Sequence, residues 1–140
     1  MYSFTQTYGI LVHTQYVRRM PAWFETIFVS PSHHRVHHAT NPLYLDRNYG
    51  GVFIVWDRLF GTFQGEVAGV KPHYGIVRQL GTFNLGWVAF HEWIAIARDL
   101  WSAPWGAKLG YLWREPGWSH DGSRETSDMI RARWLAARKG

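Results

Sequence analysis

The segment Ser32-His33-His34-Arg35-Val36-His37-His38 places four imidazole rings within six consecutive positions. A helix turns about 100° per residue, so His34, His37 and His38 would share one face, with His33 beside them. Imidazoles converging at spacings of three and four supply the neutral lone pairs that a divalent first-row metal needs. A pH-sensitive surface patch or accidental composition is the alternative, but crowded imidazoles without a metal repel one another once protonated. We therefore predict a metal-binding helix, whose metal the spacing leaves open among zinc, iron, copper and nickel.

The remaining histidines are weaker candidates for ligands. The chain has no cysteine, which excludes a thiolate site, a disulfide scaffold and a thiol nucleophile. His13 lies in an apolar segment, residues 8–17, where a histidine is more often a hydrogen-bonded core residue than a ligand. His73, His91 and His120 fall in stretches typical of loops or surface. Judged from the residues alone, the metal site therefore depends on the histidine segment.

Composition limits the class of protein and its partners. A chain of 140 residues is long enough for one domain with its own core. The formal charge of +5 is spread over single basic residues, whereas a nucleic-acid reader concentrates such charge on one face, so we expect no nucleic-acid partner. A solvated basic surface and a membrane-facing surface both stay open, since the nine tryptophans suit a lipid–water boundary. We expect no secretory signal, because residues 1–17 lack a basic start and an apolar core of the usual length. No run approaches the ~18 apolar residues of a membrane span.

Hydrophobic periodicity and cap residues predict a mainly helical chain. Ser30 or Ser32 is expected to cap the histidine helix, because serine before a helical segment accepts its first backbone N–H groups. Residues 52–60 are apolar and β-branched, and the pattern leaves them ambiguous between helix and strand. The other expected helices span residues 3–19, 21–28, 84–102 (capped by Asn84) and 104–113 (ended by Pro116-Gly117-Trp118). A final helix, capped by Thr126 or Ser127, is expected to run to Lys139, and loops are expected at 41–42, 46–51 and 61–69.

Three longer motifs carry a family resemblance. They are SPSHHRVHHATNPLYLDRNYGGVFIVWDRLFGTFQGE (residues 30–66), KPHYGIVRQLGTFN (residues 71–84) and PGW (residues 116–118). The first resembles the C-terminal histidine box of the sterol desaturase / fatty acid hydroxylase superfamily of membrane-bound di-iron oxygenases. The other two resemble its alkylglycerol monooxygenase-like branch. The resemblance covers most of the chain, from about Tyr8 to Trp118.

The resemblance implies a fold and a reaction. Residues 1–120 would form the C-terminal part of a fatty acid hydroxylase domain, with the last histidine box at 33–38, and residues 121–140 a basic helix or tail. The fold would be the C-terminal end of a transmembrane helix plus a helical cytosolic cap. Two non-haem irons on the cytosolic side of the membrane would use O2 to hydroxylate or desaturate a C–H bond of a sterol, fatty acid or ether lipid. An electron-transfer partner would supply the electrons.

The resemblance also implies roles for particular residues. His34, His37 and His38 would be iron ligands of the last box, and His13, in VHT, matches a family histidine on the preceding transmembrane helix. Hydrogen bonds that orient ligand imidazoles are expected from His33, Asp46 and Asn48. Packing beneath the site is expected from Trp56, Asp57, Phe60 and Gly61.

The chain departs from the family pattern in its number of histidine boxes. The family has an HxxxH box and a further HxxHH box upstream of this one, and the residues before His33 contain neither. The four candidate ligands are fewer than a di-iron site needs. We therefore expect a C-terminal fragment of a longer enzyme, or a chain completed by an N-terminal portion on another chain, and no lipid turnover by the isolated material. The alternative is a non-catalytic metal-binding remnant at the membrane surface.

Overall fold

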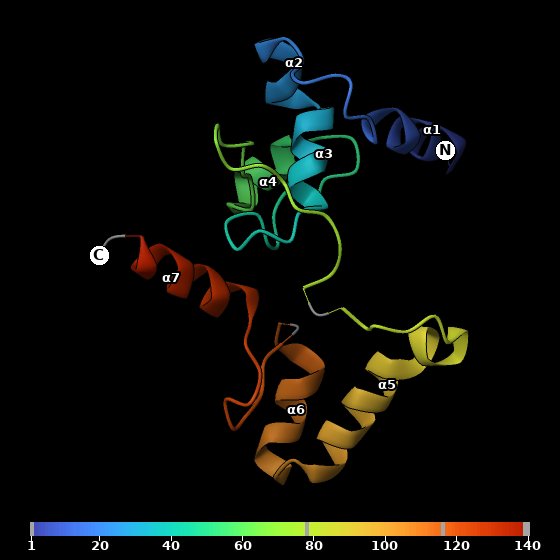
Figure 1. Cartoon of the computed structure of the whole chain (residues 1–140), viewed down its shortest axis with the longest axis vertical. Helices are drawn as coiled ribbons and strands as arrows, with labels where there is room; N and C mark the ends of the chain where they lie inside the picture. The colour runs from blue at the N-terminus through green and yellow to red at the C-terminus, as the bar shows by residue number, and fades with distance from the viewer. Residues whose placement is uncertain (1, 78, 116, 139–140) are drawn as a thin grey trace. The chain divides into compact units, whose positions relative to one another are not determined.

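The computed structural model describes residues 2–77, 79–115 and 117–138 (Figure 1). Within these ranges the chain forms helices joined by loops, and its only β pairings are isolated bridges at Phe28–Phe53 and Ala39–Tyr74. This confirms the mainly helical prediction. It divides into two compact units, Met1–Val77 and Arg78–Gly140. These units do not test the predicted boundary of the family domain at residue 120, which stays a prediction. Pro116 and Lys139, where helix ends were predicted, lie outside the described residues.

The first unit carries four short helices. The first expected helix ends seven residues early, at Val12 instead of Arg19, and leaves His13 in the turn that follows. The ambiguous apolar segment is helical only from Val55, because Phe53 pairs with Phe28 in an antiparallel bridge. The helices are α1 (Tyr2–Val12), α2 (Ala22–Ile27), α3 (Pro31–His37) and α4 (Val55–Phe60).

Helix α3 begins where the sequence places one of its two candidate caps. The Ser30 side chain accepts a hydrogen bond from the His33 N–H at 3.4 Å, and the Ser30 N–H donates back to His33 Nδ1 at 3.3 Å. Pro31 occupies the first turn, where its missing N–H costs nothing and its fixed φ favours the helix. Ser30, not Ser32, is therefore the cap, and this sets the register of the histidines.

The core of the first unit lies behind α3. Val36 is fully buried with Ala39 and Tyr44, and on α3 it points about 160° away from His34 and His38. The Tyr44 hydroxyl donates to the Val70 carbonyl and accepts from the Val67 N–H, both at 2.9 Å. These contacts hold the segment after α4 against one face of α3 and leave the opposite face to the histidines.

Two buried polar side chains organise the loops around α4. The carboxylate of Asp57 accepts from the backbone N–H groups of Tyr49 at 2.7 Å and Gly50 at 2.8 Å, and from the Thr62 hydroxyl at 2.7 Å. Asn48, in the left-handed region at φ 56°, donates to the Gln64 carbonyl at 2.8 Å and accepts from its N–H at 2.9 Å. Asp57 thus orders the loops on both sides of α4, whereas Trp56 and Phe60, for which packing beneath the site was also expected, are exposed.

The second unit contains α5 (Leu85–Ser102), α6 (Trp105–Trp113) and α7 (Ser127–Ala137), close to the predicted bounds. Asn84 caps α5 by accepting from the Trp87 N–H at 3.0 Å. Helices α5 and α6 pack against each other. Large side chains along both helices are nevertheless exposed, among them Phe90, Trp93, Trp101, Trp105, Leu109 and Trp113.

The resemblance implies the end of a transmembrane helix near the start of the chain. Helix α1 has 11 residues. Across residues 2–77, 79–115 and 117–138, none of the helices combines the length and the apolar character that crossing a membrane requires.

Candidate metal centre

Helix α3 and its C-terminal cap residue, His38, present two imidazoles side by side. His34 and His38 are four positions apart, so both point to the same side of the helix, and their Nε2 atoms lie 3.0 Å apart. Their rings meet edge to face, with centroids 4.5 Å apart. The cap at Ser30 and the buried Val36 fix this face, and a pair of converging nitrogens results.

His13 brings a third imidazole to the pair from the turn after α1. Its Nε2 lies 2.9 Å from that of His34 and 3.0 Å from that of His38. Its other ring nitrogen, Nδ1, donates to the Gly9 carbonyl at 2.5 Å. This bond assigns the proton to Nδ1 and leaves the Nε2 lone pair free to bind a cation, the arrangement found at most metal-bound histidines.

The three-imidazole cluster (His13, His34 and His38) has the spacing of a metal site. Each residue offers one nitrogen, and all three nitrogens lie within 4.8 Å of one another. Imidazole nitrogens bind a first-row metal at about 2.0–2.1 Å, and two such bonds at a right angle separate the nitrogens by about 3.0 Å. The observed separations of 2.9–3.0 Å match this value. The residues present therefore fit a metal held on one face by three histidines.

The electrostatics of the cluster favour neutral rings. Burial, and then the neighbouring imidazoles of His13, His38 and His37, lower the pKa of His34 to about 4. Burial also lowers the pKa of His38, with further contributions from His37 and His13. Both side chains are therefore uncharged at neutral pH and present lone pairs, not protons, to a cation.

His37, the remaining predicted ligand, lies beside this cluster and is not one of its members. Its ring stacks on that of His34 with centroids 5.6 Å apart, and it meets His38 edge to face at 5.1 Å. Its Nδ1 lies 3.4 Å from the Arg47 carbonyl. The structure thus brings three of the four predicted ligands, His13, His34 and His38, into one converging group, and the ligand role of His37 stays a prediction.

The three residues expected to orient ligand imidazoles have the following surroundings in the structure. His33 is buried and its Nδ1 belongs to the cap with Ser30. Asn48 donates to the backbone carbonyl of His33 at 3.0 Å, so it fixes the path of α3 and not an imidazole. Asp46 is exposed, and its side chain makes no hydrogen bond to a histidine within the described chain. In the described chain His33 and Asn48 thus engage backbone groups, and their role in orienting ligand imidazoles stays a prediction.

Sequence reasoning missed the role of Arg35, which lies between the histidines. Its guanidinium donates to the carbonyls of Val17 at 2.9 Å and Arg18 at 2.6 Å, and it pairs with the Glu66 carboxylate at 2.7 Å. A third carbonyl, that of Thr14, lies at 3.3 Å. Arg35 thereby ties the segment after His13 to α3. The one hint in the sequence is a charged residue inside a metal-type motif.

A cavity of about 470 Å³ opens onto the three imidazoles. Val12 and Ile76 supply apolar walls, while Arg35 and Tyr74 line its polar side. The other histidines form separate contacts: His91 Nδ1 donates within α5 to the Val88 carbonyl at 3.0 Å, and His120 lies 2.8 Å from the Tyr111 hydroxyl. The cavity gives the cluster both access and an apolar surrounding.

The sequence of this chain is similar to those of known proteins. Residues 1–62 match the fatty acid hydroxylase family. The chain is 38% identical over 118 residues to an alkylglycerol monooxygenase of Danio rerio, and 37% identical over 117 residues to one of Homo sapiens. These alignments cover 84% and 83% of this chain and 26% of each relative. An alkylglycerol monooxygenase of Caenorhabditis elegans is 44% identical over 88 residues, covering 63% of this chain and 17% of the relative.

The chain thus spans about a quarter or less of the length of these curated relatives. No solved structure matches it. The similarity runs well beyond the histidine segment, since the two longest alignments include more than four-fifths of the chain. Together with the family match, it shows that this chain is similar to the fatty acid hydroxylase family over residues 1–62 and to alkylglycerol monooxygenases over most of its length.

Proposed function

We propose that this chain supplies iron ligands to a membrane-bound, O2-dependent monooxygenase that hydroxylates a lipid C–H bond. The observation that carries the proposal is the triangle of Nε2 atoms from His13, His34 and His38, with sides of 2.9–3.0 Å. The similarity to proteins named alkylglycerol monooxygenase supports an ether lipid as the substrate. The proposal leaves open a sterol or fatty acyl substrate, and desaturation in place of hydroxylation, because enzymes of the same superfamily use these substrates and this reaction.

The ligand roles divide between two irons. His13, His34 and His38 are proposed to hold one iron through their converging nitrogens. His37 is proposed to bind the second, because its Nδ1 faces the Arg47 carbonyl and its Nε2 stays free for a metal. Two irons need more ligands than these four. The proposal therefore requires further ligands from outside these 140 residues, whether on the same polypeptide or on another.

The chain's own residues prepare the site for this chemistry. Non-haem iron, when bound, supplies the redox chemistry by which O2 and an external electron donor oxidise an unactivated C–H bond. The Gly9 carbonyl fixes the tautomer of His13, and burial keeps His34 neutral. Val12 and Ile76 line the adjoining cavity, where an alkyl chain would lie against the cluster and displace water.

Membrane association on the cytosolic side is part of the proposal. Apolar side chains of α1 are exposed, namely Phe4, Ile10 and Leu11. The exposed tryptophans of α5 and α6 are the residue type that favours the lipid–water boundary. Both features support contact with lipid, with α1 as the C-terminal end of a membrane helix.

The test begins with metal binding by the 140-residue chain. Cobalt(II), a spectroscopic substitute for ferrous iron, is titrated anaerobically into the chain and into His34→Ala and His38→Ala. We expect one tightly bound equivalent in the chain and its loss in both variants, while His91→Ala, a histidine of α5, serves as the matched control. Equal binding by all four proteins would refute the assignment.

Lipid oxidation is tested in native membranes that contain the protein. These membranes are supplied with a 1-O-alkylglycerol, O2 and a reductant, and the oxidised products are quantified with the iron content. We expect His37→Ala to lower both quantities and His91→Ala to lower neither. Metal binding without lipid oxidation under these conditions would favour the non-catalytic metal-binding module instead.

A further inference from the structure

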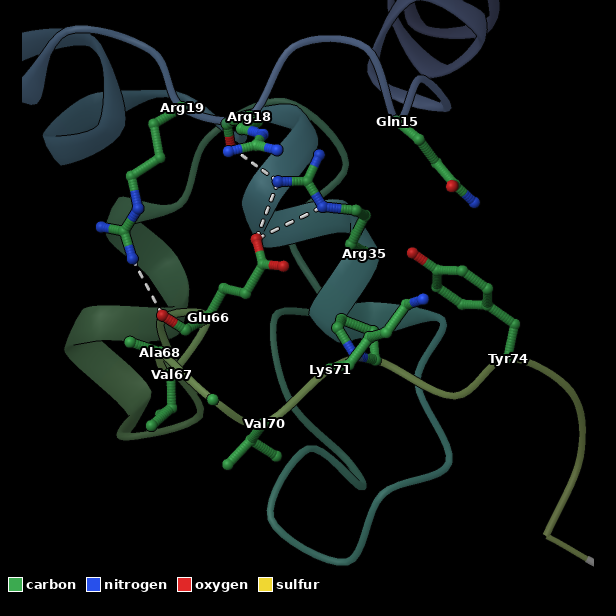
Figure 2. A pocket seen from close by; sticks show the side chains of 12 residues that line it. Gln15, Arg18, Arg19, Arg35, Glu66, Val67, Ala68, Val70, Lys71 and Tyr74 are labelled. Carbon is green, nitrogen blue, oxygen red and sulfur yellow. Dashed lines mark hydrogen bonds and ion pairs between the residues drawn. The ribbon is translucent and has the colours of Figure 1, made fainter.

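A second cavity adjoins the one that opens onto the three-imidazole cluster, and we propose that it binds a phosphate group. It has a volume of about 620 Å³. Four cationic side chains line it, from Arg18, Arg19, Arg35 and Lys71, against the single carboxylate of Glu66 among its described lining residues. Figure 2 shows these side chains around the cavity, with Glu66 reaching toward Arg35.

The one carboxylate is already neutralised. Glu66 accepts from Arg35 through Nη2 at 2.7 Å and Nε at 3.3 Å, and this pair is largely shielded from solvent. Arg19 donates to the backbone carbonyl of Glu66 at 2.8 Å and not to its carboxylate. Arg18 and Lys71 form no ion pair with the described residues, and both are exposed. A net positive charge therefore faces the cavity without a counter-charge.

Hydrogen bonds hold the backbone at Arg18 and at Lys71. The Arg18 carbonyl accepts from Arg35 at 2.6 Å, and the Lys71 carbonyl accepts from the Asn41 amide at 3.1 Å. The Asn41 side-chain oxygen also accepts from the His73 N–H at 2.7 Å, so the oxygen and the nitrogen of this amide both hold the segment that carries Lys71. The backbone at Arg18 and at Lys71 is consequently held by hydrogen bonds where both residues line the cavity.

A phosphate group suits this arrangement better than a carboxylate. Guanidinium groups bind phosphate oxygens through parallel N–H donors, and an ammonium adds a compact point charge. Arg18, Arg19 and Lys71, the cations that are not paired with the Glu66 carboxylate, match the three peripheral oxygens and the double charge of a phosphomonoester. The cavity volume lies in the range that holds a small organic ligand, so a phosphate attached to a glycerol-sized group has room.

The two cavities share Gln15, Arg35 and Tyr74 as lining residues. An amphiphile whose phosphate lies between Arg18 and Lys71 would therefore extend its apolar part toward Val12, Ile76 and the imidazoles. This assignment of the phosphate to a lipid that reacts at the metal rests on the proposed function. The binding of phosphate itself depends only on the cationic cavity.

The test compares one double variant with a matched control in the full 140-residue chain. Arg18→Gln/Lys71→Gln removes two cavity charges, while Arg98→Gln/Arg138→Gln removes two exposed charges from the second unit. Binding of inorganic phosphate is measured by calorimetry, and binding to phosphatidylcholine vesicles with and without phosphatidic acid by cosedimentation. Circular dichroism and cobalt stoichiometry verify that each variant is folded.

We expect the cavity variant to lose about tenfold or more in affinity for the phosphate-bearing probe, and the control to stay within about twofold of the unmodified chain. Cavity-dependent binding of inorganic phosphate identifies a site for the free anion. Cavity-dependent binding of phosphatidic acid vesicles alone identifies a lipid-borne phosphate, and either result supports the proposal. No binding of either probe, or equal losses in both variants, overturns it.

The metal-site variant His13→Ala separates this inference from the proposed function. We expect it to lose cobalt and to keep phosphate binding, since His13 does not line the cationic cavity. A chain that binds phosphate through Arg18 and Lys71 but binds no cobalt would refute the metal site alone. A chain that binds cobalt but no phosphate probe would refute the phosphate site alone.

Discussion

The Nε2 atoms of His13 and His34 lie 2.9 Å apart, although 21 positions separate the residues in the sequence. Helix α2 and its flanking turns form the intervening chain. Arg35, the residue after His34, holds the start of that chain through the carbonyls of Val17 and Arg18. The approach of the two imidazoles is thus supported by a hydrogen-bonded clamp directly beside them.

The first prediction distinguishes the observed cluster from the sequence motif alone. His13→Ala removes one of three converging nitrogens, so we expect the affinity of the first cobalt equivalent to fall about 100-fold or more, beyond the 10–100-fold typical of indirect changes. His37→Ala is expected to leave that equivalent in place. Anaerobic cobalt titration followed by absorption spectroscopy measures both. The reverse result, with His37 essential and His13 dispensable, would contradict the geometry.

The second prediction concerns the pH dependence of the metal-free chain. The folded state holds the pKa of His34 at about 4, below the ordinary value of 6.5, so the unfolded chain binds the proton more readily. The free energy of unfolding should therefore fall as the pH drops from about 6.5 to about 4, and level off below that. Urea denaturation at a series of pH values measures it. His34→Gln should flatten this slope, and an unchanged slope in the variant would assign it to other groups.

A third prediction tests the clamp formed by Arg35. Arg35→Lys keeps the charge but loses the planar set of donors that reaches three carbonyls and Glu66, so we expect a loss of about 2–4 kcal/mol in stability. Hydrogen exchange should increase over residues 14–19, and cobalt affinity should fall because His13 is held less firmly. Arg98→Lys, on the exposed side of α5, is the control. Unchanged exchange over residues 14–19 would show that the clamp is dispensable.

The fourth prediction uses two adjacent glycines in the loop before α4. A Cβ atom on Gly50 would lie 2.5 Å from the Phe53 carbonyl oxygen and 2.8 Å from Asp57 Oδ2, whereas one on Gly51 meets nothing within 4 Å. We expect Gly50→Ala to lower the free energy of unfolding by about 1–3 kcal/mol and Gly51→Ala to change it by less than about 0.5 kcal/mol. Thermal denaturation of both variants decides the matter. Equal effects would contradict the close approach.

Much of the secondary structure follows from local signals. The caps Asn84 and Thr126 lie where the sequence predicts helix starts. The side chain of each accepts a hydrogen bond from the backbone N–H of the residue three positions later. The prediction fails where an apolar segment carries no local stop. The first helix was expected to continue to Arg19, but it ends at Val12 because the following turn directs His13 Nε2 to α3 and offers its carbonyls to Arg35.

The sequence by itself determined the parts of the site that lie on one helix. Ser30 and Pro31 set the start of α3, and the helical repeat then puts His34 and His38 on one face, because near neighbours fix local backbone geometry. The cap role of His33 is local as well, since its partner Ser30 lies three positions before it. The resemblance names His13 as a ligand, but only the tertiary structure brings its Nε2 atom to within 3.0 Å of the pair. That approach depends on how segments far apart in the chain pack, and no spacing within one segment encodes it.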